Sequence, residues 1–257
     1  MTSIEWTRGD DGLPGKTWNP TTGCDRVSPG CDHCYAATMA ARLQAMGSPR
    51  YQANGNPRTS GPGFKLTIHP DTLDLPYSWR KPRRVFVNSM SDLFHPDVPD
   101  GFIAQVWEVM GRASQHTYQV LTKRPQRLAA WVNRWVGGSG VTLTNVWLGT
   151  SIESDRYCWR ADHLRATPAA VRFLSLEPLL GPLPSLDLDG VGWVIIGAES
   201  GRGARPMDDD WVRDIRDRCV TAGIPFFFKQ QATHAGQKLP LPELDGRRWA
   251  EFPEARR

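Results

Sequence analysis

The sequence predicts an α/β protein built on a parallel β-sheet with helices outside it, in the manner of a (β/α) barrel. Two observations support this fold class. Six short apolar runs alternate with helix-prone segments between residues 84 and 228, which is the pattern of a parallel sheet covered by helices. Polar residues follow each run directly, as expected where the carboxyl ends of barrel strands meet. A chain of 257 residues can form one such domain with a large core.

The region before this alternation contains shorter elements. An irregular lead-in precedes a short extended piece at residues 16–19, and a loop with three cysteines follows it. Residues 35–46 are rich in Ala, Leu and Met and predict a helix that ends at Gly47. Residues 48–63 hold Pro, Gly, Asn and Ser and predict a long loop. The alternating residues 65–69 predict a short strand.

The repeating part supplies most of the predicted sheet. The six predicted strands are residues 84–87, 117–121, 146–148, 171–174, 193–196 and 226–228. Helices are predicted near residues 100–113, 125–135, 155–164 and 208–222. The last of these opens on three aspartates, which the helix dipole favours. We expect one domain over residues 1–232 and an irregular extension over residues 233–257, which are rich in Pro, Arg and Glu.

Charged and hydroxyl side chains stand at the predicted strand ends. In chain order they are Ser89, Ser91, Asp92, Lys123, Ser151, Glu153, Glu177, Glu199 and Lys229. Because the carboxyl ends of parallel strands open on the same face of a barrel, these side chains should gather at one mouth. Polar strand ends also arise simply because they meet solvent, but six in series, several with carboxylates, favour a functional face.

The three-cysteine loop is the most specific chemical feature. Cys24, Cys31 and Cys34 form a C-x6-C-x2-C array, and the loop would lie at the same mouth because it follows the first extended piece. The chain has five cysteines, an odd number. In a reducing compartment such clustering favours a metal over disulfides. Cys158 and Cys219 lie in helix-prone segments and are expected to pack as small apolar groups.

Two metal chemistries fit three clustered thiols. A structural zinc site needs a fourth ligand, for which His33, His69 or His95 are the candidates, and would indicate a non-catalytic, zinc-stabilised nucleic-acid-binding protein. An iron–sulfur cluster can instead take three thiolates and keep its fourth iron open for a small molecule. That arrangement suits an enzyme.

The bulk properties limit the location and the partners. The chain has no apolar run long enough for a membrane span and no secretory signal at its start, so we expect a cytoplasmic protein without membrane association. The net charge of +4 permits an acidic partner. Two basic runs, residues 80–84 beside Trp79 and residues 123–127, suit nucleic acid, although such runs are commonly solvated surfaces.

Several segments resemble known families. The three-cysteine loop, followed by Tyr35 at the start of a βα chain, looks like the radical S-adenosylmethionine (radical SAM) superfamily. Residues 87–96 and 120–124 resemble its spore photoproduct lyase-like branch. A phage and bacterial family with a three-cysteine motif is closer still, and its likeness covers residues 3–231. The segments that carry it are 17–36, 175–179 and 227–230.

This resemblance implies a partial (β/α) barrel of the TIM type with about six parallel strands, a [4Fe–4S] cluster and S-adenosylmethionine. Cys24, Cys31 and Cys34 would ligate the cluster. The implied cofactor-binding residues are Tyr35, Ser89, Ser91, Asp92, Ser151 and Glu153. The candidates for catalytic or substrate contacts are Lys123, Glu177 and Glu199, with Lys229 beside them.

The implied reaction is reductive cleavage of S-adenosylmethionine, followed by hydrogen-atom abstraction from a substrate. It needs a reductant such as flavodoxin or ferredoxin. DNA or RNA repair or modification is the leading substrate class, because both the basic runs and the lyase-like resemblance favour it.

Overall fold

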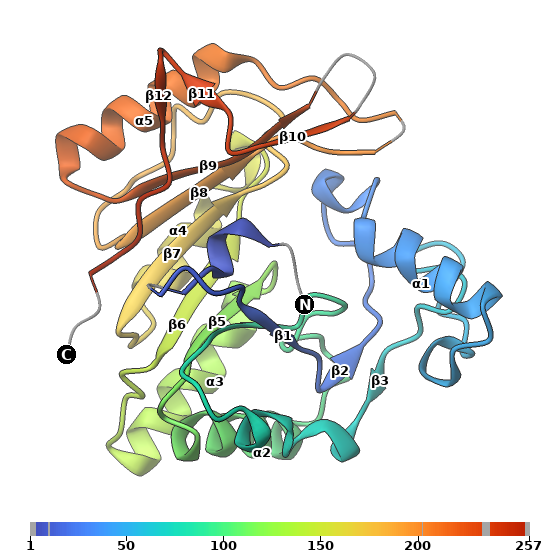
Figure 1. Ribbon diagram of the computed structural model, residues 1–257. Helices are drawn as coiled ribbons and strands as arrows, with labels where there is room; N and C mark the ends of the chain where they lie inside the picture. Colours follow the sequence, from blue (N-terminus) through green and yellow to red (C-terminus); the bar gives the residue numbers. More distant parts are fainter. Residues whose placement is uncertain (1–3, 10, 202, 233–236, 255–257) are drawn as a thin grey trace.

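The computed structural model describes residues 4–9, 11–201, 203–232 and 237–254, and a curved eight-stranded sheet organises them (Figure 1). The strand order is β1-β4-β5-β6-β7-β8-β9-β10. The first seven of these strands are parallel, and β10 pairs antiparallel with β9. The bounds are β1 Lys16–Trp18, β4 Arg84–Val87, β5 Thr117–Thr122, β6 Val146–Ser151, β7 Val171–Leu176, β8 Trp193–Gly197, β9 Phe226–Ala232 and β10 Lys238–Pro240.

The sheet curls as an incomplete barrel, which confirms the predicted α/β class and the partial barrel but not the strand count. Six parallel strands were expected and seven are present, because the extended piece at residues 16–19 joins the sheet as β1 beside β4. The eighth strand comes from the tail, whose residues also form the hairpin of β11 (Glu243–Leu244) and β12 (Arg247–Arg248). The predicted domain boundary at residue 232 stays a prediction.

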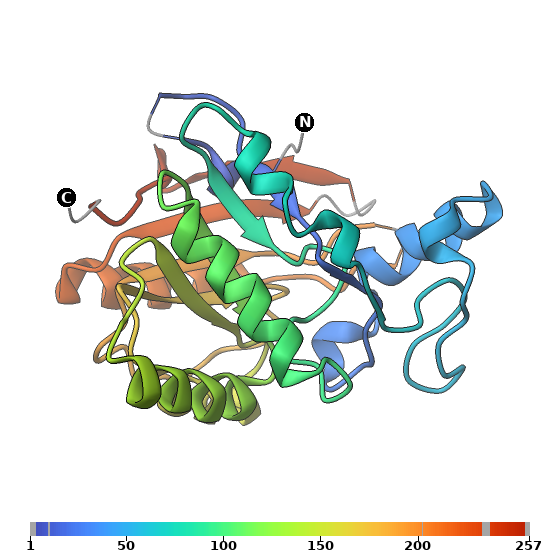
Figure 2. The ribbon, with the colours of Figure 1, turned by 90° about the horizontal axis from the view of Figure 1, so that it is seen from below.

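Four helices cover the outer side of the curve (Figures 1 and 2). They are α2 (Asp100–Arg112), α3 (Pro125–Ser139), α4 (Trp159–Arg165) and α5 (Asp209–Ala222). Alternate strand residues such as Val85, Val120 and Leu174 face these helices and form the main core with them. Cys158 and Cys219 belong to the same core, as the sequence predicts.

The concave side of the sheet has an aromatic floor. Trp6, from the short 3-10 helix η1 (Glu5–Thr7), packs inside the curve with Phe173 and Trp193. Gly149 makes room for one of these rings, since a Cβ added there would lie 2.4 Å from the Phe173 ring. The amino-terminal half of the barrel is therefore filled by side chains, and space is left toward the carboxyl ends of the strands.

A separate lobe stands beyond those strand ends (Figure 1). It contains α1 (Tyr35–Ala45) and the short pair of β2 (Thr21–Thr22) and β3 (Thr67–Ile68). A small cluster of its own, including Ala40, Tyr51 and Phe64, stabilises the lobe. The cysteine loop connects this lobe to the barrel.

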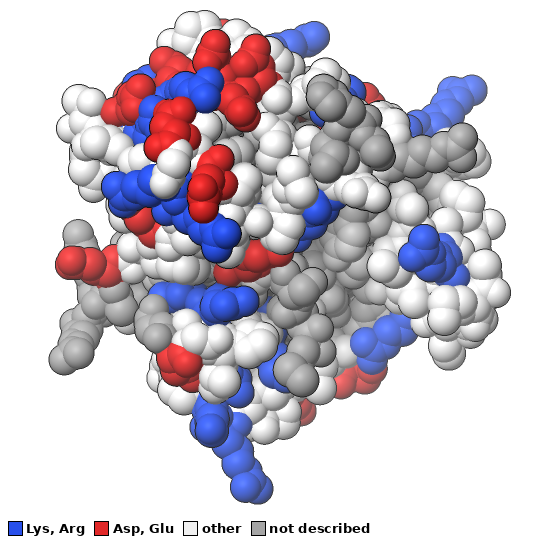
Figure 3. All heavy atoms as spheres, turned by 45° about the horizontal axis from the view of Figure 1, so that its top comes forward, with Lys and Arg blue, Asp and Glu red and all other residues white. Residues whose placement is uncertain are grey.

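The outer surface over α5 carries acidic and basic side chains interleaved with one another (Figure 3). Arg213 pairs with Asp210 and Asp245, and Arg216 also reaches Asp245. This face is therefore a solvated ion-pair surface rather than a patch of one sign. In the part of the chain that the structure describes, no helix is both long enough and apolar enough to cross a membrane.

Candidate active site

A cavity of about 880 Å³ lies where the strand ends meet the cysteine loop. Its walls come from the loop, the strand ends and the segment around Trp6. The volume is in the range of small-molecule and cofactor sites. Its lining combines thiols, carboxylates and ammonium groups.

The structure brings together eleven of the twelve site residues predicted from the sequence. The residues that line the cavity are Cys24, Cys31, Cys34, Tyr35, Ser89, Ser91, Asp92, Lys123, Ser151, Glu177 and Glu199. Lys229 lines it as well. The predicted common mouth therefore exists in the structure, whereas the role of each residue stays a prediction.

Glu153 is the predicted residue that does not line the cavity. Its side chain is fully buried, and one carboxylate oxygen accepts a hydrogen bond of 3.0 Å from Arg160. The carboxyl group lies under the cysteine loop, because a Cβ added to Gly30 would come within 3.1 Å of it. At this position the carboxyl group supports the cysteine loop, and its predicted contact with the cofactor stays a prediction.

Local geometry places the three thiols at the mouth. Gly23 has a φ of +85°, and an added Cβ would lie 2.1 Å from the carbonyl oxygen of Lys65, so a side chain cannot be accommodated before Cys24. Cys31 closes a 3-10 turn that begins at Pro29, and Cys34 precedes the first residue of α1. Turns and a helix start thus direct three thiols of one loop into one cavity.

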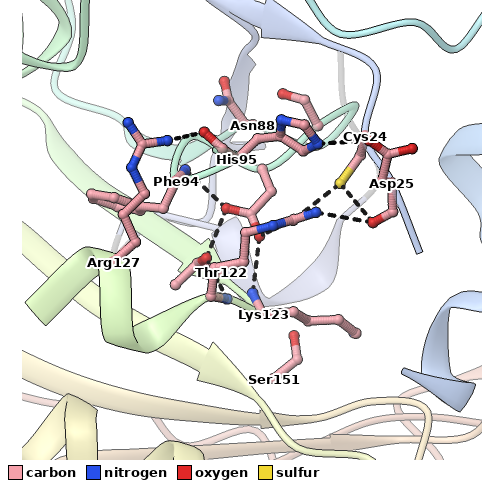
Figure 4. A network of polar contacts seen from close by, with 12 residues as sticks. Cys24, Asp25, Asn88, Phe94, His95, Thr122, Lys123, Arg127 and Ser151 are labelled. Carbon is pink, nitrogen blue, oxygen red and sulfur yellow. Dashed lines mark hydrogen bonds and ion pairs between the residues drawn. The ribbon is translucent and has the colours of Figure 1, made fainter. Parts of the chain in front are cut away.

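Cys24 is anchored by residues from the segments that follow β5 and β4 (Figure 4). The guanidinium of Arg124 lies 3.3 Å from Cys24 Sγ and also donates to the carbonyl oxygen of Asp25. The side-chain carboxylate of the same Asp25 is held at 2.9 Å by His95 Nε2. Burial raises the pKa of the Cys24 thiol to about 12; the charge of Asp92 adds to this rise and Arg124 opposes it.

Asp92 was predicted to contact a cofactor, but protein donors occupy both of its oxygens. Oδ1 accepts from Phe94 N at 2.9 Å and from Thr122 Oγ1 at 2.7 Å. Oδ2 accepts from Lys123 N at 3.1 Å and from Arg124 at 3.0 Å. The carboxylate therefore orients Arg124 and joins the ends of β4 and β5.

Glu199 fastens the other end of the cysteine loop. Oε2 accepts from His33 Nδ1 at 2.7 Å and from Arg205 N and Nε at 3.0 Å each, and Oε1 accepts from Arg205 Nη2. Arg205 also donates to the carbonyl oxygen of Pro29. Burial alone would raise the pKa of Glu199, but the hydrogen bonds from Arg205 and His33 lower it to about 2. The carboxylate is charged near neutral pH and links the loop after β8 to the cysteine loop.

Three further charged residues that line the cavity are Lys123, Glu177 and Lys229. Lys229 Nζ donates a hydrogen bond to Glu177 Oε1, and the two side chains form an ion pair on the cavity wall. Lys123 lines the cavity, and among the described residues no carboxylate pairs with its ammonium group. A cation without a protein anion in a cavity is suited to an anionic group of a ligand. Ser89 and Ser91 hold the β1–β2 connection through Asn19 and Thr21.

The thiols of the cavity are arranged for a cluster rather than for a single metal ion. Among the described residues, no three His, Cys, Asp or Glu side chains are gathered closely enough to hold a single metal ion. The histidines considered as a fourth zinc ligand have other partners: His33 bonds to Glu199, His95 to Asp25 and His69 to Thr22. A cluster takes each thiolate on a separate iron, so separated thiols on one cavity wall suit it.

Sequence reasoning missed three residues of the site. Arg124 directly follows a predicted strand and belongs to a basic run, but neither observation gave it a role beside Cys24. Arg205 lies in a loop and gave no local signal. Asn88 sits at the end of β4 with a φ of +58°, lines the cavity and donates to Thr21 Oγ1, while its buried Oδ1 has no partner among the described residues.

The cations of the two basic runs differ in exposure. Arg84 is buried, with its guanidinium 4.2 Å from the ring centre of Phe252. Arg127 donates to the carbonyl oxygens of His95 and Val98 (Figure 4 shows the first of these). Arg80 and Lys81 are exposed beside Trp79, which lines the cavity.

Comparison with known proteins shows the family to which the chain belongs. A family model described as "Protein of unknown function (DUF5131)" matches residues 1–253. The chain belongs to the DUF5131 family. No curated protein matches this DUF5131 member significantly.

Two solved structures are similar to this DUF5131 chain, and both are of spore photoproduct lyase. One is a mutant with bound AdoMet and dinucleoside spore photoproduct, with a TM-score of 0.42 and 13% identity over 79% of this chain and 60% of that one. The other is complexed with dinucleoside spore photoproduct, with a TM-score of 0.42 and 13% identity over 77% of this chain and 59% of that one. The match thus spans about three fifths of their length.

Proposed function

We propose that the protein is a radical SAM-type enzyme whose [4Fe–4S] cluster is held by Cys24, Cys31 and Cys34. The observation that carries this proposal is that three thiols of one loop line the same cavity as the polar carboxyl ends of six parallel strands, β4 to β9. The other two cysteines of the chain are buried in the core between sheet and helices. Three thiolates leave one iron of a cluster open to a small molecule.

The chain's own residues would bind and orient such a molecule. The ammonium of Lys123 would hold a carboxylate or a phosphate. The buried Oδ1 of Asn88 is an acceptor on the cavity wall that a ligand N–H could satisfy. The aromatic floor around Trp6 closes the barrel from its amino-terminal side, which would keep water from a reactive centre.

When bound, the cluster and S-adenosylmethionine would supply an electron from a flavodoxin- or ferredoxin-type reductant and a 5′-deoxyadenosyl radical that abstracts a hydrogen atom. The ion pair of Glu177 and Lys229 lines the cavity, where it would orient a substrate. For the substrate we propose DNA or RNA, because Arg80 and Lys81 are exposed beside Trp79 at the edge of the cavity.

Anaerobic purification and reconstitution test this proposal. The wild-type protein is expected to bind about four irons and four sulfides per chain and to be brown. Cys31→Ala should lose this loading, whereas Cys158→Ala, a matched change in the core, should retain it. Stoichiometric zinc without iron in the wild type, or full loading of Cys31→Ala, would contradict the ligand assignment.

A further inference from the structure

Arg124 makes one cysteine of the loop different from the other two. Its Nη1 lies 3.3 Å from Cys24 Sγ, and its Nη2 lies 3.1 Å from the carbonyl oxygen of Asp25. Neither Cys31 nor Cys34 receives a hydrogen bond from a cationic side chain within the described part of the chain. The three thiols are therefore electrostatically unequal.

The position of this guanidinium is fixed by its surroundings. Its side chain is 11% exposed, and Asp92, which is 8% exposed, holds Nη1 at 3.0 Å. Asp92 is in turn held by Thr122 Oγ1 and by the backbone of Phe94, as described above (Figure 4). The backbone N of Arg124 donates to Thr122 Oγ1 at 2.9 Å. Such a network costs little reorganisation when charge changes beside it.

Arg124 is the counter-charge of the nearly buried Asp92 carboxylate, and the same guanidinium also reaches the thiol. Asp92 already accepts three hydrogen bonds from Phe94, Thr122 and Lys123. The guanidinium of Arg124 contacts this carboxylate, Cys24 Sγ and the carbonyl oxygen of Asp25. A charge-assisted donor on a sulfur stabilises added negative charge there, and hydrogen bonds to sulfurs and nearby charge are known means of setting the potential of iron–sulfur clusters.

We propose that Arg124 is a positioning residue that raises the reduction potential of the cluster bound through Cys24, and that Asp92 partly offsets this effect. This inference rests on the proposed function. One electron from an external reductant converts the cluster from the 2+ to the 1+ state, and part of the added charge falls on the thiolate sulfurs. The guanidinium stabilises that charge and the carboxylate opposes it. The two residues should therefore shift the potential in opposite directions.

A redox titration of the reconstituted protein tests this inference, with the reduced cluster followed by electron paramagnetic resonance. Arg124→Gln should shift the midpoint potential to more negative values, and Asp92→Asn should shift it to more positive values. The control is Arg134→Gln, which removes the same charge from an exposed position on α3. It should leave the potential unchanged.

The outcomes separate this inference from the proposed function. A wild-type protein that takes up no cluster would remove the proposed function itself. A loaded wild type with equal potentials in both variants, or shifts of the same sign, would overturn the role of Arg124 alone. If Arg124→Gln does not fold, Asp92→Asn decides: a positive shift supports the inference, and an unchanged or more negative potential overturns it.

Discussion

Replacing Arg205 with Gln removes the cation that joins Glu199 to the cysteine loop. The guanidinium makes two side-chain hydrogen bonds to Glu199, one to the carbonyl oxygen of Pro29 and an ion pair of 3.6 Å with Asp32. Without it, the buried Glu199 carboxylate keeps a side-chain partner only in His33 and a backbone donor at residue 205.

The magnitude follows from the burial of the two partners. Breaking a buried ion pair costs roughly 3–5 kcal/mol. Arg205 is 31% exposed and Glu199 is 4% exposed, so solvent screens one partner and His33 compensates in part. We therefore expect Arg205→Gln to lower the free energy of unfolding by about 2 kcal/mol, or the midpoint of thermal unfolding by about 4–8 °C for a chain of this size.

Urea unfolding of the metal-free protein at pH 7 measures this cost, and Arg134→Gln is the matched control. Arg134 pairs with Asp100 at an exposed position, so that change should cost about 0–1 kcal/mol.

The lowered pKa of Glu199 also predicts how the difference in stability between wild type and variant changes with pH. Its stabilising effect is present above the ordinary pKa of 4.5 and is lost as the pH falls toward about 2. The gap between wild type and variant should close over that interval. A gap below about 0.5 kcal/mol at pH 7, or one that grows on acidification, would refute the reasoning.

Three further predictions concern the barrel and its mouth. Gly149→Ala should lower the free energy of unfolding by about 1–3 kcal/mol, because its Cβ would overlap the Phe173 ring; an unchanged urea midpoint would contradict this packing. If Lys123 holds the carboxylate of S-adenosylmethionine, Lys123→Ala should weaken its binding at least about tenfold, as expected for loss of a charge-assisted hydrogen bond, with unfolding unchanged; equal affinity by calorimetry would exclude contact with that carboxylate. Replacing the three cations of residues 80–83 that are not buried with Gln should reduce the salt dependence of single-stranded DNA binding by a slope of roughly 2; an unchanged slope would place the nucleic acid elsewhere.

The sequence was informative where a local pattern determines structure. Apolar runs followed by polar residues located the six central strands, and convergence of their ends followed from parallel pairing alone. The edges of the sheet depend on distant partners instead. Lys16–Trp18 becomes β1 only because β4 lies beside it, and Lys238–Pro240 becomes β10 although its proline favours an irregular reading. An edge strand tolerates such a proline.

The site residues likewise divide into those that a local pattern indicates and those that depend on partners distant in sequence. The thiols were recognisable by type and spacing, and strand-end polar groups by position. Partners remote in sequence were not: His33 and Glu199 are 166 residues apart, and nothing local to either indicates their hydrogen bond. Glu153 follows β6 as other cavity residues follow their strands, yet the chain turns it beneath Gly30. The position of a residue after a strand predicts the end of the sheet at which it lies. Its contacts there depend on residues that are close in space and distant in sequence.

The central claim is that the cysteine loop forms a centre that cleaves S-adenosylmethionine. The most direct measurement is chromatographic detection of 5′-deoxyadenosine after the reconstituted protein is reduced with dithionite in the presence of S-adenosylmethionine. The wild type should form 5′-deoxyadenosine, and Cys31→Ala should form none. A wild-type protein that is fully loaded and reduced but forms no 5′-deoxyadenosine would contradict the account.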